Sequence, residues 1–127
     1  MAATEPFPRV VDDVTQAGID AYAELSGDFN PLHVDPEAAA ASEFGGIIAH
    51  GPIALQSFLR AATEWLGVEA LPAGTSVAVV YRAPTRPGDA IAAEPRSVTE
   101  REDGRHDVEA ECVKQDGTTV VSVRAVL

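Results

Sequence analysis

The sequence predicts an α+β fold in which an antiparallel sheet curls around one long helix. Helical patterns come first and end with residues 51–66, whose first half is apolar nearly all round, as is typical of a helix covered by other structure. After Gly74 the pattern changes to the two-residue alternation of strands, and Asp103-Gly104 and Asp116-Gly117 are hairpin turn signals. Helices followed by hairpin-connected strands are typical of the α+β class.

The first part of the chain is predicted to contain a short strand and two helices. Residues 7–14 form a mixed segment that we expect to be a strand. Thr15 is a candidate N-cap for a helix that continues to about Leu25, with Leu25 on its apolar side. A turn-rich loop over residues 26–33 follows. Asp35-Pro36 then has the residue types of an N-cap and first helical position, and predicts a short helix through residue 41.

The long helix and the strands come next. Gly51-Pro52 is expected to open the helix and Gly67 to end it. The strands predicted after it cover residues 75–82, 90–100, 107–114 and 118–127. Pro95 lies inside the second of these strands. Because proline has no N–H for a strand ladder, we expect a bulge or an edge position there.

The composition describes a single domain, residues 1–127, with 46% hydrophobic residues and therefore enough apolar side chains for a core. The net charge of −11 argues against a nucleic-acid partner, since such binding needs a positive surface. We expect no leader peptide and no membrane association, because no basic segment with a following apolar run begins the chain and no apolar stretch is long enough to span a bilayer. Cys112 is the only cysteine, which favours a reducing, cytoplasmic location, and no Cys/His spacing suggests a metal site.

The stretch Leu25-Ser26-Gly27-Asp28-Phe29-Asn30-Pro31-Leu32-His33 places an acid and an imidazole five residues apart on a constrained loop. Gly27 permits backbone conformations that a side chain resists, and Pro31 fixes its own φ and disfavours helix at Asn30. Such a loop can hold Asp28 and His33 in one geometry, as general acid–base chemistry requires. The same residue types are common in turns without any chemistry, so the spacing alone leaves the function open.

This nine-residue string, the Asp35-Pro36 helix start and the His50-Gly51 step together resemble the MaoC-like (R)-specific enoyl-CoA hydratase and 3-hydroxyacyl thioester dehydratase family. The segment Arg82-Ala83-Pro84-Thr85-Arg86-Pro87-Gly88-Asp89 is also similar to the connector that precedes the next strand in that family. The resemblance covers the chain from about Ala21 to the C-terminus. It implies the hot-dog fold, in which a sheet wraps one long helix.

The resemblance also implies an activity: reversible hydration of a trans-2-enoyl thioester to an (R)-3-hydroxyacyl thioester, with no cofactor and no metal. Asp28 and His33 would bind and activate a water, Asn30 would brace the loop, and the Gly51 N–H would bind the thioester oxygen. These residue types suit the chemistry, because hydration needs a base for water, an acid for Cα and a donor for an enolate-like oxygen. A glycine at a helix N-terminus offers an unpaired N–H at the positive end of the helix dipole.

Several alternatives share this sequence pattern. The same chemistry can act on an acyl group bound to an acyl-carrier protein instead of CoA. A hot-dog thioesterase would use a carboxylate on the central helix, where Glu64 is the only acid and lies far from Gly51. A non-enzyme alternative is an inactive partner subunit of a heteromeric dehydratase, although such subunits usually lack the acid–imidazole pair. Candidates for contact with an anionic CoA or carrier group are Arg60, Arg82, Arg86 and Arg96, although each of them alone is better explained as a scattered, solvated arginine.

The remaining expectations concern packing and assembly. The side chains of His50, His106, Tyr22 and Trp65 are predicted to be structural. Gln56 and Ser57 lie on the helix expected to be mostly buried, where a polar group needs a partner. Open sheet edges and an incompletely covered helix favour a homodimer or a dimer of dimers.

Overall fold

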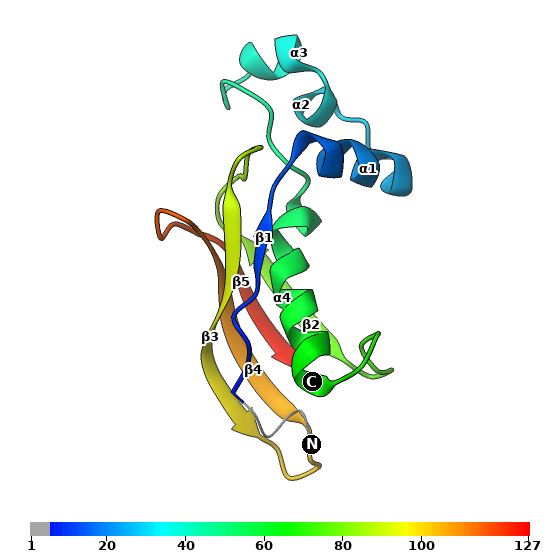
Figure 1. Cartoon of the computed structure of the whole chain (residues 1–127), viewed down its shortest axis with the longest axis vertical. Helices are drawn as coiled ribbons and strands as arrows, with labels where there is room; N and C mark the ends of the chain where they lie inside the picture. The colour runs from blue at the N-terminus through cyan, green and yellow to red at the C-terminus, as the bar shows by residue number, and fades with distance from the viewer. Residues whose placement is uncertain (1–5) are drawn as a thin grey trace.

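A computed structural model describes residues 6–127, and its strands form one five-stranded antiparallel sheet with a long helix against one face (Figure 1). The strands are β1 (Val11–Asp13), β2 (Ser76–Tyr81), β3 (Ala90–Glu100), β4 (His106–Lys114) and β5 (Thr119–Val126), in the spatial order β1-β3-β4-β5-β2. The helices are α1 (Gln16–Ser26), α2 (Pro31–Val34), α3 (Pro36–Ala40) and α4 (Gly51–Leu66). The predicted α+β class is confirmed.

The hairpins of the sheet follow the turn signals of the sequence. Gly104 and Gly117 adopt φ values of 85° and 88° in the turns that join β3 to β4 and β4 to β5. The register of β3 shifts between Pro95 and Ser97, which confirms the expected bulge. Strand β1 pairs only with residues 90–92 of β3. At Pro95, β3 therefore pairs with β4 alone among the described residues, and its other edge is open.

The core lies between α4 and the inner face of the sheet. Phe58 of α4 is fully buried and stacks on Phe7, with ring centroids 5.7 Å apart. From β4, Val108, Ala110 and Cys112 point into this layer, as their alternation indicates. Burial raises the pKa of the Cys112 thiol, so this cysteine is a core side chain and not a nucleophile.

The structure corrects the expected burial of α4. The sheet covers one side of this helix, and an exposed stripe with a spacing of four residues follows its other side: Pro52, Gln56, Arg60 and Glu64. Gln56 is therefore exposed, contrary to expectation, whereas the buried Ser57 hydroxyl lies 3.8 Å from the Cys112 sulfur. Among residues 6–127, no helix combines the length and apolarity needed to cross a membrane.

Three expectations for the N-terminal part are also corrected. Only Val11–Asp13 of the expected strand pairs with β3. Leu25 is 85% exposed, because α1 buries Ile19 and Ala23 and turns the opposite side to solvent. Residues 31–34 form one helical turn where a loop was expected, since Pro31 occupies the first position and Asn30 caps it.

Candidate active site

The helices α1, α2 and α3 gather at one end of the sheet, beside the first turn of α4 (Figure 1). Gly27 ends α1 with a φ of 77° and donates its N–H to the carbonyl of Ala23. Three residues later, the Asn30 Oδ1 accepts the Leu32 N–H at 3.0 Å and caps α2. These two helix ends fix a tight corner, with Asp28 inside it and His33 on the following turn.

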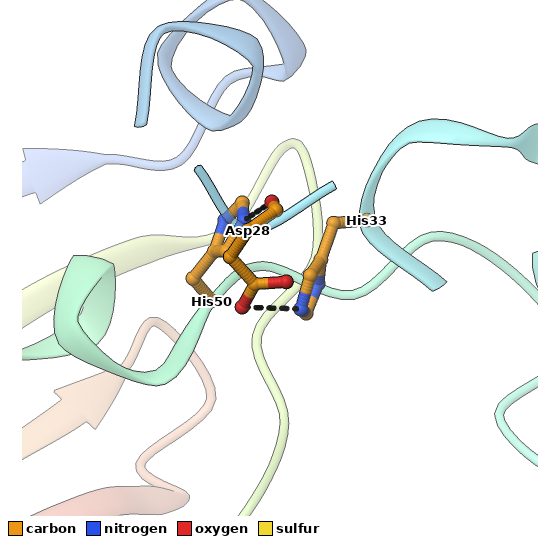
Figure 2. A group of neighbouring side chains, drawn as sticks. All are labelled: Asp28, His33 and His50. Atoms are coloured by element: carbon orange, nitrogen blue, oxygen red, sulfur yellow. Dashed lines mark hydrogen bonds and ion pairs between the residues drawn. The ribbon is translucent and has the colours of Figure 1, made fainter. Parts of the chain in front are cut away.

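Asp28 and His33 face each other across a short gap (Figure 2). Asp28 Oδ2 lies 3.9 Å from His33 Nε2, and the side chains are 53% and 11% exposed. The other carboxylate oxygen, Oδ1, accepts the Asn30 N–H at 3.1 Å. A separation of 3.9 Å is too long for a direct hydrogen bond and suits a bridging water.

The hydrogen bonds of His33 assign its tautomer. Its Nδ1 lies 2.7 Å from the carbonyl oxygen of Ile48, which can only accept a proton. In the neutral ring the proton is therefore on Nδ1, and the lone pair of Nε2 points towards Asp28. The gap between the two side chains is thus bordered by two hydrogen-bond acceptors.

His50 belongs to the same cluster (Figure 2). Its ring is 2% exposed and stacks on His33 with centroids 3.9 Å apart, and its Nε2 lies 2.9 Å from the backbone oxygen of Asp28. The sequence predicts only a structural role for this residue, so the structure adds it to the site. The signal that could have found it is its position directly before Gly51.

The cluster also has the residue types of a metal site. Asp28, His33 and His50 offer ligand atoms that lie within 4.8 Å of one another. Two of the four imidazole nitrogens, His33 Nδ1 and His50 Nε2, already bind backbone carbonyls. The carboxylate and His33 Nε2 border the gap, and His50 Nδ1 is buried without a hydrogen-bond partner among the described residues. The two groups at the gap can together hold one water by its hydrogens.

Gly51 is the first residue of α4, and its N–H has no acceptor among residues 6–127. The next N–H along the helix, that of Ile53, is occupied by the His50 carbonyl, and Pro52 has none. The Tyr81 ring covers Gly51 so closely that an added Cβ would lie 3.0–3.3 Å from its carbons. Burial, with a smaller contribution from the charge of Tyr22, raises the pKa of the Tyr81 phenol, which therefore stays neutral.

An open groove of about 310 Å³ begins at Gly51. Apolar side chains contribute most of its walls, among them those of Phe44, Ile48, Ala54, Tyr81 and Pro84. Gly51 is therefore at the wall of a mostly apolar groove that can take a small ligand.

The four candidate arginines have different surroundings. Arg60 and Arg96 are paired with carboxylates, those of Asp12 and of Glu94 and Glu111. The guanidinium groups of Arg82 and Arg86 have no carboxylate within 4.0 Å among the described residues; that of Arg82 donates to Ser122 and that of Arg86 to the Phe44 carbonyl. Arg82 lines the groove, and Arg86 lies farther along the same connector.

The profile of the MaoC like domain family matches residues 2–121. The chain belongs to this family. Its fold agrees with that of a solved structure, the (R)-hydratase from A. caviae involved in PHA biosynthesis, with a TM-score of 0.81 and 30% identity over 94% of this chain and 90% of that one. The expected hot-dog fold is thereby confirmed.

Two relatives of this MaoC-like domain are named for their activities. The 3-hydroxyacyl-thioester dehydratase Z of Mycobacterium tuberculosis is 37% identical over 68 residues, 54% of this chain and 42% of the relative. The (R)-specific enoyl-CoA hydratase of Aeromonas caviae is 36% identical over 88 residues, 68% of this chain and 64% of the relative. The chain thus matches about half of the length of these relatives.

Proposed function

We propose that this MaoC-like domain is a hydro-lyase that interconverts trans-2-enoyl thioesters and (R)-3-hydroxyacyl thioesters by reversible addition of water. The observation that carries the proposal is the gap of 3.9 Å between Asp28 Oδ2 and His33 Nε2. It has two acceptors for the hydrogens of one water and lies beside a helix N-terminus with a free N–H. The names of the similar hydratase and dehydratase support the same reaction class.

In the hydration direction, a water bound in the gap donates one hydrogen to Asp28 and the other to His33. Its oxygen lone pairs then point away from both groups and towards the substrate. The oxygen forms a bond to C3 as one of the two residues takes the proton, and the C2–C3 π electrons move towards the thioester carbonyl. The protonated group of the pair then supplies a proton to C2. Dehydration follows the same steps in reverse.

The thioester oxygen becomes negatively charged during the reaction, and Gly51 is the residue proposed to stabilise it. Its N–H is unpaired and lies at the positive end of α4, a helix of 16 residues. Glycine is suited to this position because a Cβ here would lie only 3.0–3.3 Å from carbons of the Tyr81 ring, which would then have to shift. The acyl chain would occupy the apolar groove that begins there.

The carrier of the acyl group is either CoA or an acyl-carrier protein. Arg82 lines the groove and Arg86 lies on the same connector; the guanidinium groups of both lack a carboxylate partner among the described residues and can contact the phosphates of either carrier. One similar protein is named an enoyl-CoA hydratase, which favours CoA, and the other is named only by its thioester, which leaves carrier-protein substrates as the second candidate. Rates on crotonyl-CoA and on the crotonyl carrier protein distinguish them.

Loss of either member of the pair should abolish turnover. We expect Asp28→Asn and His33→Ala to reduce hydration of crotonyl-CoA by about 100-fold or more, as is usual for loss of a general acid–base. The decrease in the enoyl-thioester absorbance measures the rate. Asp103→Asn and His106→Ala make the same changes at the opposite end of the sheet and should keep the wild-type rate.

Other results would favour the alternatives. Near-full turnover of Asp28→Asn would contradict the assignment of the pair. Release of free thiol from crotonyl-CoA would indicate a thioesterase. A wild-type chain that is inactive alone and active only with a second chain would indicate a partner subunit of a heteromeric dehydratase.

A further inference from the structure

His50 is the most buried ionisable side chain of the cluster, and the proposed reaction gives it no chemical step. It contacts three different segments: the Asp28 backbone through Nε2, the His33 ring at 3.9 Å and the Tyr22 ring at 4.7 Å. Its Nδ1 is buried and has no hydrogen-bond partner among the described residues. A buried polar atom without a partner is costly, so the ring must be held here by its other contacts.

We propose that His50 is a positioning residue: its Nε2–H fixes the backbone of Asp28, and its ring fixes the ring of His33. The inference rests on the proposed hydratase function, in which these two residues hold the reacting water. His50 itself does not touch water or substrate in this scheme.

The contact with Asp28 is needed because little else holds that residue. Asp28 lies between α1 and α2, outside regular structure, and its side chain is 53% exposed. Within the corner itself, Asp28 Oδ1 accepts the Asn30 N–H, and the Asp28 N–H donates to Ser26 Oγ. The backbone oxygen of Asp28 is tied to the core by His50, at 2.9 Å. Because a carbonyl only accepts, this bond places the proton of the neutral His50 ring on Nε2.

The stack with His33 restricts the other half of the pair. The hydrogen bond from His33 Nδ1 to the Ile48 carbonyl fixes one edge of the ring but permits rotation about it. His50 covers one face of the His33 ring, with 30° between the planes, and the Tyr22 ring of α1 contacts the His50 ring at a tilt of 52°. His50 thus packs against rings from both α1 and α2.

The position of His50 in the chain extends its effect to the oxyanion donor. Gly51 follows directly, so the segment that supports Asp28 and His33 also presents the free N–H. The positions of Asp28, His33 and the Gly51 N–H thus all depend on the same short segment, His50-Gly51. Small displacements matter at such a site, since a shift of about 1 Å can reduce a rate by about 100-fold.

Two substitutions separate the contacts of His50. His50→Phe keeps an aromatic ring for the stack and removes the donor to Asp28, whereas His50→Gln keeps an N–H donor near the Nε2 position and removes the ring. His106→Phe and His106→Gln are the matched controls, because His106 also packs on an aromatic ring, that of Trp65 at 4.8 Å, near the other end of α4. The constants kcat and KM are measured on crotonyl-CoA, at a temperature well below the melting temperature of each variant.

We expect His50→Phe to lower kcat by about 10- to 100-fold with KM within about threefold of wild type. His50→Gln should recover part of kcat, and both His106 variants should match wild type. Equal kcat in His50→Phe and His106→Phe would overturn the proposal.

A second measurement does not depend on activity. Long-range ¹H–¹⁵N spectra of the wild-type chain should show the ring proton of His50 on Nε2 and that of His33 on Nδ1. A proton on Nδ1 of His50 would overturn the proposal even if His50→Phe did not fold. If the wild-type chain hydrates no enoyl thioester, the proposed function fails, while the spectra still decide the positioning role.

Discussion

At the scale of single residues, Asn30 links the two halves of the candidate site through two hydrogen bonds. Its backbone N–H donates to Asp28 Oδ1 at 3.1 Å, and its side-chain Oδ1 accepts the Leu32 N–H at 3.0 Å. The first bond orients the carboxylate, and the second caps the helical turn on which His33 lies. Only the second depends on the side chain of residue 30, so substitution can separate the two.

Asn30→Ala should remove the cap and leave the bond to Asp28. We expect a loss of about 1 kcal/mol in the free energy of unfolding, the usual effect of losing an N-cap, together with a lower kcat because α2 positions His33. Asn30→Ser, which keeps a capping oxygen, is the matched control and should be close to wild type in both. Urea unfolding and crotonyl-CoA hydration measure the two effects. If the alanine and serine variants behaved alike, the cap would have no role.

The sequence allowed prediction of the residues of the site whose contacts are local. Asp28, Asn30 and His33 fall within six residues, and turn chemistry alone brings the first two together. The partners that are distant in sequence could not be predicted in this way. The carbonyl of Ile48 is a backbone group with no residue-type signal, and the His50 ring reaches Asp28 across 22 residues.

At the scale of helices and strands, predictions were accurate where a local signal marks an element's end. The predicted bounds of α4 match the structure because Pro52 and Gly67 act within one turn of each end. The burial of its faces was predicted less well, since Gln56 is exposed. The residues of α4 fix its periodicity, but the tertiary fold decides which side meets the sheet.

Asp89 joins several elements and makes the stability of the fold dependent on pH. It accepts the Arg86 N–H at 2.8 Å and a hydrogen bond from Gln115 at 3.1 Å, and Lys114 of β4 lies at 3.4 Å. Burial acts to raise the pKa of this carboxyl, but these hydrogen bonds and the Lys114 charge together hold it below its ordinary value of 3.8. The carboxylate therefore stabilises the folded state above that value, and the stabilisation is lost as the pH falls through the lowered pKa.

Asp89→Asn should remove this contribution. We expect it to lower the free energy of unfolding near pH 6 by about 1–3 kcal/mol, the range for hydrogen bonds to a charged group, and to differ much less from wild type near pH 3. Urea unfolding at the two pH values provides the measurement. Asp103→Asn, at the exposed β3–β4 turn, controls for removal of one negative charge. An equal difference between wild type and Asp89→Asn at both values would contradict the linkage.

At the scale of the whole molecule, the sheet leaves a long edge open. Strand β2 is at one end of the strand order, and its six residues, Ser76–Tyr81, include no charge and no proline. The Arg82 N–H donates to the Val120 carbonyl on β5, so alternation directs the N–H groups of Val77, Val79 and Tyr81 to the open side. An apolar edge of this kind is a template for pairing with another strand.

We expect this edge to pair with its copy in a homodimer, and Val79→Pro should weaken the dimer. Proline at position 79 removes an outward N–H and leaves the bonds to β5 intact, whereas the matched control Val79→Ala keeps that N–H. Sedimentation should give twice the chain mass for wild type and Val79→Ala, and a dissociation constant at least about tenfold higher for Val79→Pro. Because each chain has a net charge of −11, the dimer should also tighten as salt screens the repulsion between the copies. A wild-type monomer at high concentration, or equal affinity in the two variants, would show that β2 does not form the interface.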